Sequence, residues 1–243
     1  MEPWTRPPAN PLPRSGEVFA LLVDLHTARE RLVGLTAGFT DRERERAAQF
    51  ATHEWRDRWS AARGTLREVL GRALGIESGA VRFRYGLHGK PELDPGCAKG
   101  AAGLRFNISH SGDRALIALA RVEVGADVER LKTRRTDDIA RRFFAPGEQQ
   151  RLFAFTGSER EAAFFRLWTC KEAFLKVTGE GLSRSTRSYE IEMAQSGSRL
   201  VWAKGLPEAA SRYSVFPLEP GNGYAGAIVA ENQGLTLRRF GWP

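Results

Sequence analysis

The most informative part of the sequence is FFRLWTCKEAFLKVTGEGL, residues 164–182. Apolar residues recur in it at helical spacing, which predicts a helix from about Ser158 that stops at Gly179 or Gly181. Lys171 nevertheless lies on the apolar face of this helix. A buried lysine must lose its proton, find an anion, or extend its stem until the ammonium reaches water. An internal salt bridge and a contact with a ligand both remain open.

Glu172 follows this lysine directly and precedes Lys176 by four residues. A glutamate and a lysine at this spacing can form a surface pair worth only about 0.3–0.5 kcal/mol. They can also be the polar residues of a functional site. The helix on its own does not distinguish the two interpretations.

The composition limits the class of protein. With 243 residues, of which 42% are hydrophobic and 27% charged, the chain can form one large or two modest soluble domains. No apolar run approaches the roughly 20 residues of a membrane helix, and no signal peptide is recognisable. Cys97 and Cys170 are far apart and suggest neither a disulfide framework nor a zinc site. We therefore expect a cytoplasmic protein with no membrane partner.

The formal charge of +8 at pH 7 concerns partners rather than the fold. A surplus of arginine favours polyanions, which include nucleic acids, phosphorylated small molecules and acidic proteins. In the first half this charge includes Arg46, Arg63 and Lys90. Most arginines on helices face solvent, and we expect one or two of these to bind phosphate.

The order of predicted elements suggests two halves. Residues 1–16 form a Pro-rich lead-in that we expect to be flexible. Strand and helix patterns then occur twice in similar order, in residues 17–121 and residues 122–243, with a seam near Arg121. In the first half, a long helix beginning near His53 is expected to bury Trp55 among its inward residues. The fold class is therefore α+β.

The segment VGADVERL contains two carboxylates on one face of a predicted strand. Residues two apart in a strand point the same way, so Asp127 and Glu129 stand together. Two close carboxylates repel unless a cation or a shared proton intervenes, and such oxygen ligands suit Mg²⁺. The alternative is a solvated edge strand in which Glu129 pairs with Arg130.

The segment FNISHSGD ends a predicted strand in a polar turn. Ser109 and His110 in this turn can donate hydrogen bonds to an anion such as a phosphate. The alternative is an ordinary turn with a hydrogen-bonded histidine. No G-x-S-x-G pattern is present, so the sequence does not support a hydrolase nucleophile.

Four motifs together resemble one family. GKP (residues 89–91), FNISHSG (106–112), GADVE (125–129) and WTCKEAFLKVTGEGL (168–182) occur in the order and spacing of 4′-phosphopantetheinyl transferases. The resemblance is to the large, surfactin-synthetase-activator type, and it covers about residues 50–182. Each motif is weak alone, whereas the ordered set is specific.

The resemblance implies a fold and a reaction. The family's fold is a pseudo-two-fold pair of similar α+β halves with the active site at the seam. Its members, which include holo-[acyl-carrier-protein] synthases, transfer the phosphopantetheine arm of coenzyme A to a serine of an apo carrier protein. They release adenosine 3′,5′-bisphosphate and use Mg²⁺, or Mn²⁺ in its place.

The resemblance also implies roles for individual residues. Asp127, Glu129 and Glu172 are expected to hold the metal, and Glu172 is also the expected base for the serine hydroxyl. Lys176 and His110 are expected to contact the diphosphate of coenzyme A. The other residues expected to bind coenzyme A are Arg46, Arg63, Lys90, Ser109 and Lys171.

The resemblance further implies an acidic carrier protein or domain as partner, and a monomeric enzyme. Fatty-acid, polyketide and nonribosomal-peptide carriers all remain open. Two alternatives remain. A nucleic-acid-binding protein would explain the basic charge but not the paired carboxylates at Asp127 and Glu129. A relative that binds coenzyme A or carriers without catalysis is disfavoured, because the three expected carboxylates are intact.

Overall fold

The computed structural model describes residues 3–86, 89–132, 135–179, 185–194 and 197–243. The chain divides into two compact units: Met1–Arg121 with Leu237–Pro243, and Val122–Thr236. We assigned everything after residue 121 to the second half, and the last seven residues depart from that assignment. They belong to the first unit because they form most of a strand, β11 (Thr236–Trp242), in its sheet.

The N-terminal lead-in is also part of the first unit. The Thr5 N–H donates to the Arg239 carbonyl at 3.2 Å, and the Gly241 N–H donates to the Thr5 carbonyl at 2.8 Å. Pro11 and Pro13 are buried. We predicted this segment to be flexible. In the structure it is instead hydrogen-bonded to β11 at Thr5 and partly buried.

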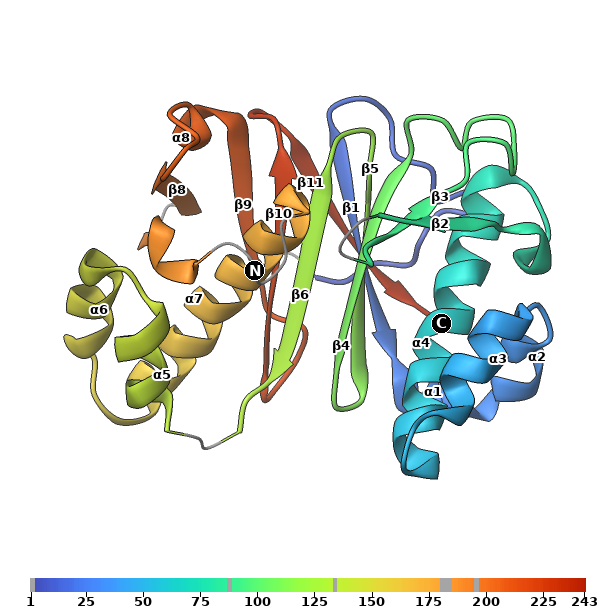
Figure 1. Cartoon of the computed structure of the whole chain (residues 1–243), viewed down its shortest axis with the longest axis horizontal. Helices are drawn as coiled ribbons and strands as arrows, with labels where there is room; N and C mark the ends of the chain where they lie inside the picture. Colours follow the sequence, from blue (N-terminus) through green and yellow to red (C-terminus); the bar gives the residue numbers. More distant parts are fainter. Residues whose placement is uncertain (1–2, 87–88, 133–134, 180–184, 195–196) are drawn as a thin grey trace. The chain divides into compact units, whose positions relative to one another are not determined.

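The first unit is built on a sheet with the strand order β11-β1-β5-β4 (Figure 1). The β1–β5 and β5–β4 pairs are antiparallel. Its core contains the inward residues of this sheet and of the long helix α4. The other elements of the unit are β1 (Glu17–Asp24), β2 (Phe83–Tyr85), β3 (Pro91–Leu93), β4 (Arg105–Ser111), β5 (Arg114–Ala120), α1 (Leu25–Glu30), α2 (Leu32–Thr36), α3 (Asp41–Ala48), α4 (His53–Leu74) and the 3₁₀ turn η1 (Ser78–Ala80).

The second unit has an antiparallel sheet with the order β6-β10-β9-β8-β7. Helix α7 packs against β6 and β10 (Figure 1), and its apolar residues fill the core of this unit. The elements are β6 (Val124–Arg130), β7 (Tyr189–Ala194), β8 (Gly197–Ala203), β9 (Tyr213–Leu218), β10 (Tyr224–Glu231), α5 (Thr136–Phe143), α6 (Pro146–Phe153), α7 (Gly157–Thr178), α8 (Ala209–Arg212) and the 3₁₀ turn η3 (Thr186–Ser188). Each unit thus combines a sheet with helices, as the predicted α+β class requires.

The bounds and the apolar face of helix α7 agree with the prediction from the sequence. It begins after Thr156 and ends at Gly179, whose φ of +71° is the left-handed conformation typical of a glycine after a helix. Gly181, the other predicted stop, lies outside the described residues, as do the last residues of the motif. The predicted apolar face is confirmed, because Phe164, Leu167 and Phe174 are all buried.

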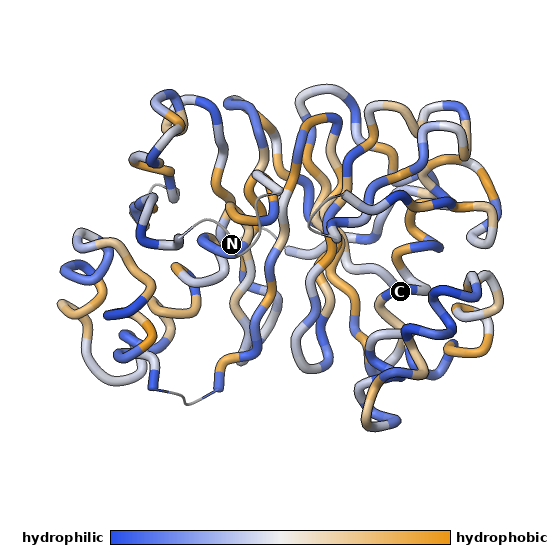
Figure 2. Tube along the Cα trace, viewed as in Figure 1, coloured by the Kyte–Doolittle hydropathy of each residue, from blue (hydrophilic) through white to orange (hydrophobic). Residues whose placement is uncertain are grey.

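The first unit differs from the prediction in two places. Trp55 was predicted to face inward but is 61% exposed. The helix α4 begins at His53, as predicted, and Trp55 lies in its exposed first turn. Helices α1 and α2 were not predicted, since they are short and have no extended apolar period. Helix α3 begins at a reciprocal capping box formed by Thr40 and Glu43. Its hydrophilic colour in Figure 2 reflects its charged sequence.

None of the helices in the described ranges has the length and apolar composition needed to cross a lipid bilayer.

Candidate functional site

Strand β6 carries two acidic side chains toward α7. A Cβ on Gly125 would lie 2.1 Å from the Ala173 carbonyl oxygen and 2.6 Å from the Val177 nitrogen, so only glycine allows this approach of helix and strand. Side chains two apart share a face, so Asp127 and Glu129 follow Gly125 on that side. Asp127 is buried and Glu129 half-buried. The alternative of a solvated edge strand is therefore wrong for Asp127.

Lys176 reaches β6 from helix α7. Its Nζ donates to Asp127 Oδ1 at 2.6 Å and to the Ala126 carbonyl at 3.1 Å. The lysine side chain remains about 30% exposed, whereas that of Asp127 is 5% exposed. The ammonium thus stands at the solvent side of a buried carboxylate, where it can also meet an anionic ligand.

The Glu172 carboxyl is close enough to Asp127, Lys176 and Glu129 for their charges to shift its pKa. Burial raises the pKa of its carboxyl above the ordinary value, and the Asp127 carboxylate raises it further. The Lys176 ammonium opposes this rise, and the Glu129 carboxylate adds to it. The structure therefore brings together Asp127, Glu129, Glu172 and Lys176, four residues that the sequence marks as functional.

The carboxylates fit a divalent cation by their chemistry. Across the described ranges, no three side chains of metal-binding type are already gathered closely enough to hold an ion. Lys176 instead neutralises part of the charge by bonding Asp127. Asp127 and Glu129 carry like charges near Glu172, and a cation bound by the three carboxylates would relieve their repulsion. Oxygen donors of this kind are those that Mg²⁺ prefers.

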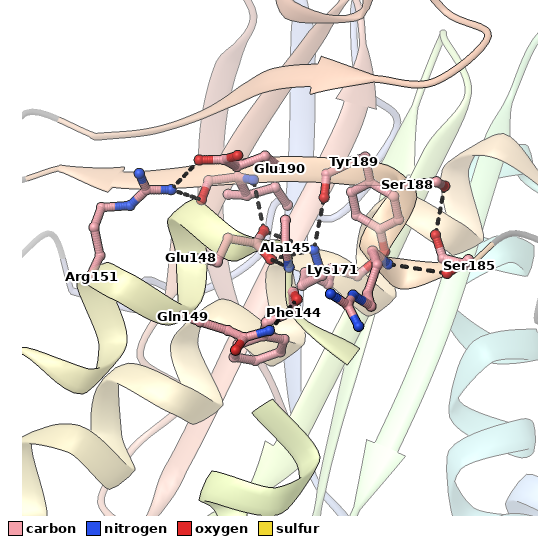
Figure 3. Close-up of polar contacts among 12 residues, drawn as sticks. Phe144, Ala145, Glu148, Gln149, Arg151, Lys171, Ser185, Ser188, Tyr189 and Glu190 are labelled. Carbon is pink, nitrogen blue, oxygen red and sulfur yellow. Dashed lines mark hydrogen bonds and ion pairs between the residues drawn. The ribbon is translucent and has the colours of Figure 1, made fainter. Parts of the chain in front are cut away.

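Lys171, the lysine on the apolar face, forms an internal salt bridge (Figure 3). Its Nζ donates to both carboxylate oxygens of Glu148 at 2.7 Å and to the Tyr189 carbonyl at 3.1 Å. Its three donors are thereby used, and the side chain is 1% exposed. Burial raises the pKa of Glu148 and lowers the pKa of Lys171, and the attraction within the pair opposes both shifts. The expectation that Lys171 binds coenzyme A is therefore corrected.

The first unit contains a separate cavity of about 410 Å³. This volume falls within the ~300–1,000 Å³ typical of small-molecule sites. Three arginines and one glutamate give its lining a net positive charge. The lining residues that bear on a ligand are Arg42, Arg46, Arg63, Trp59, Tyr85 and His110.

The predicted residues of the first unit meet this cavity to different degrees. Arg46, Arg63 and His110 line it directly. Lys90 lies between two lining residues, Gly89 and Pro91. Ser109 precedes His110 on β4, so its side chain points to the opposite face of the strand. The structure therefore does not bring Ser109 into this cavity.

Glu43, which the sequence analysis did not mark, lies in the wall of the cavity and orients the arginines. It accepts hydrogen bonds from Arg63 Nε at 2.6 Å and from Arg67 Nε at 3.0 Å. Arg63 also donates to the Tyr85 hydroxyl at 2.8 Å. The capping-box pattern of Thr40 with Glu43 was readable from the sequence, but the two arginines come from a later helix.

Glu43 gives the first unit a pH-dependent stability. Burial opposes its ionisation, but bonds from Arg67, the Thr40 N–H and Arg63 outweigh burial and lower its pKa from 4.5 to about 2. Because the folded-state pKa is depressed, the stabilisation is fully present above pH 4.5 and is lost as the pH falls toward 2. It amounts to at most about 3 kcal/mol.

We therefore expect Glu43→Gln to lower the free energy of unfolding by about 3 kcal/mol at pH 7 and by less at pH 3.5. Urea unfolding at the two pH values measures this difference. Glu45→Gln, an exposed residue of the same helix, is the control and should change stability little at either pH. An equal loss for Glu43→Gln at both pH values would contradict the assignment.

The sequence of the chain is similar to that of known proteins of one family. Residues 123–229 match the family model described as "4′-phosphopantetheinyl transferase superfamily", and residues 27–122 match "4′-phosphopantetheinyl transferase, N-terminal". The chain is 35% identical over 241 residues to the 4′-phosphopantetheinyl transferase HetI of Nostoc sp., covering 98% of this chain and 95% of HetI. It is 28% identical over 214 residues to Sfp of Bacillus subtilis, covering 88% of this chain and 92% of Sfp.

Proposed function

Because the chain belongs to the 4′-phosphopantetheinyl transferase family, we propose that it modifies a serine of an apo carrier protein with Mg²⁺ as its metal. The phosphopantetheine arm comes from coenzyme A, and adenosine 3′,5′-bisphosphate leaves. The structural observation that supports this function is the group of charged side chains in the second unit. They are Asp127, Glu129, Glu172 and Lys176.

The metal would be held by the carboxylates of Asp127, Glu129 and Glu172. When bound, Mg²⁺ would neutralise the diphosphate and stabilise the charge that develops on the leaving oxygen. Mn²⁺, which prefers the same ligands, is the expected substitute. The present bond between Lys176 and Asp127 keeps the buried carboxylate paired until the substrate arrives.

Glu172 is the proposed base. A positioned carboxylate can take the proton of a serine hydroxyl, and Glu172 lies near the carboxylates of Asp127 and Glu129 that would hold the metal. The serine Oγ gives its proton to Glu172 and attacks the phosphorus that carries the pantetheine arm. The bond from that phosphorus to the oxygen of the 5′-phosphate breaks, and the electron pair leaves with adenosine 3′,5′-bisphosphate. Lys176 then stabilises charge on the diphosphate oxygens.

Coenzyme A would be held by the basic residues that the structure describes. The arginine-lined cavity of the first unit suits a nucleotide phosphate, for which Arg46 and Arg63 are the proposed contacts. Glu43 holds Arg63 through its Nε, which orients the guanidinium before any ligand binds. His110 is the proposed contact to the diphosphate, and Lys90 to the nucleotide.

Removing one cavity arginine tests this assignment. Arg46→Ala is expected to raise the KM for coenzyme A at least about tenfold, since a charge-assisted hydrogen bond contributes about 1.5–3 kcal/mol. The kcat should change little, because in this proposal Arg46 binds a nucleotide phosphate and does not contact the reacting phosphorus. Arg56→Ala, an arginine of the same unit outside the lining, is the matched control. An unaltered KM for Arg46→Ala would make Arg46 an ordinary surface charge.

The proposed macromolecular partner is an acidic carrier protein or domain of fatty-acid, polyketide or nonribosomal-peptide synthesis. The formal charge of +8 supports an acidic partner, because complementary charges accelerate encounter. The rate of modification should therefore fall as ionic strength rises.

The function is tested by measuring adenosine 3′,5′-bisphosphate released from coenzyme A and Mg²⁺ with several apo carriers. Release that requires both the carrier and its serine supports transfer. Coenzyme A binding without release on any carrier would instead favour a relative that binds without catalysis.

A further inference from the structure

The buried pair at Lys171 belongs to a set of contacts that joins three elements (Figure 3). Lys171 Nζ donates to the Tyr189 carbonyl at 3.1 Å, and the Tyr189 hydroxyl donates back to the Lys171 carbonyl at 2.9 Å. Glu148 accepts from Lys171, from the Ala145 N–H at 2.7 Å and from the Ile191 N–H at 2.8 Å. Helix α7 is thereby tied to α6 and to strand β7.

We propose that Glu148, Lys171 and Tyr189, called here the α7 clamp, are positioning residues that set the rotation of α7 and so aim Glu172 at Asp127 and Glu129. This role rests on the function proposed above. None of the three clamp residues is more than 1% exposed, so they act through α7 and not by touching a substrate.

The clamp is placed to control rotation. Successive helical residues are about 100° apart, so a contact at Lys171 fixes a face adjacent to that of Glu172. On the strand side, α7 rests on Gly125 through the backbone of Ala173 and Val177. Contacts on two sides of one helical turn, added to the apolar packing of α7 in the core, define its orientation more closely than the packing alone.

A small roll is enough to matter. Side-chain ends lie about 5–6 Å from a helix axis, so a roll of about 10° moves the Glu172 carboxylate by about 1 Å. Misplacement of a catalytic group by about 1 Å can lower a rate by roughly 10²-fold. The polar contacts of the clamp resist such a roll more sharply than apolar packing does, because hydrogen bonds depend on direction.

Stability alone does not require this arrangement. Replacing a buried ion pair by well-packed apolar residues is often neutral or stabilising, whereas removing one partner is strongly destabilising. A Glu148→Gln/Lys171→Met pair therefore helps to separate the two roles, because it removes both charges and keeps an amide oxygen that can accept from one of the Ala145 and Ile191 N–H groups. Tyr189→Phe is a milder second variant, because it deletes only the hydroxyl that holds the Lys171 carbonyl. Val215→Ala, a buried position on β9, controls for destabilisation of the unit.

The experiment measures kcat, the KM for coenzyme A and the affinity for Mn²⁺ by electron paramagnetic resonance in the full chain. For variants with near-normal unfolding, we expect kcat and the affinity for Mn²⁺ each to fall by about tenfold. This is the lower end of the effect known for residues that orient metal ligands. The KM for coenzyme A should stay within about twofold, since the clamp touches no proposed nucleotide contact. Val215→Ala should leave all three values near those of the wild type.

Normal kcat and Mn²⁺ affinity in both clamp variants would overturn the positioning role. The role would also be overturned if Val215→Ala lost as much kcat and Mn²⁺ affinity as a clamp variant with the same free energy of unfolding. If the wild-type chain modifies no carrier, the proposed function is wrong. The difference in Mn²⁺ affinity between the wild type and the clamp variants then still tests whether the clamp orients the carboxylates.

Discussion

Asp127→Asn is expected to lower the rate of carrier modification by about 10³-fold, the upper range for removing one charge-stabilising group from an active site. Asparagine has the shape of aspartate but lacks the charge that pairs with Lys176 and would hold the metal. Asp127 is buried beside Lys176 and raises the pKa of Glu172 by repulsion. One substitution therefore removes a proposed metal ligand and the hydrogen-bond partner of Lys176 together. The measurement is a single-turnover rate at saturating coenzyme A.

The matched control for this variant is Asp138→Asn. Asp138 lies on α5 of the same unit with its side chain 66% exposed and paired to Arg141, so its charge is screened by solvent. Its rate should match that of the wild type. A rate for Asp127→Asn within a few-fold of the wild type would remove Asp127 from the site.

Glu172→Gln is expected to lower kcat by roughly 10²–10⁴-fold, the usual contribution of a general base. An amide cannot take the serine proton, but its oxygen can still face a cation. The affinity for coenzyme A should therefore change much less than kcat. Isothermal titration with coenzyme A and single-turnover kinetics separate these two quantities.

Glu161→Gln on the same helix serves as the comparison, because Glu161 lies about three turns before Glu172 in α7. It should transfer at the normal rate. If Glu172→Gln lost coenzyme A affinity but kept kcat, the carboxylate would be a binding group, and another base would have to be found.

The sequence predicts local features of this fold well where a physical signal is local. The helix ending at Gly179 follows from apolar periodicity and a glycine stop. The shared face of Asp127 and Glu129 follows from strand alternation.

Other features depend on partners distant in the sequence, and no local pattern predicts them. Lys171 was recognised as misplaced, but its partner Glu148 is 23 residues away on another helix. Glu43 meets Arg67 across 24 residues. The strand Thr236–Trp242 joins the first sheet although it follows the whole second unit. These pairings depend on tertiary structure rather than on propensity.

The most direct test of the central claim is the intact mass of an apo carrier protein after incubation with this protein and coenzyme A, with and without chelation of Mg²⁺. The account predicts a gain of one phosphopantetheine group, which disappears on chelation and returns when Mg²⁺ is restored. It also predicts no gain on a carrier whose acceptor serine is replaced by alanine. An unchanged mass across fatty-acid, polyketide and nonribosomal-peptide carriers would contradict the account, as would a gain that chelation leaves intact.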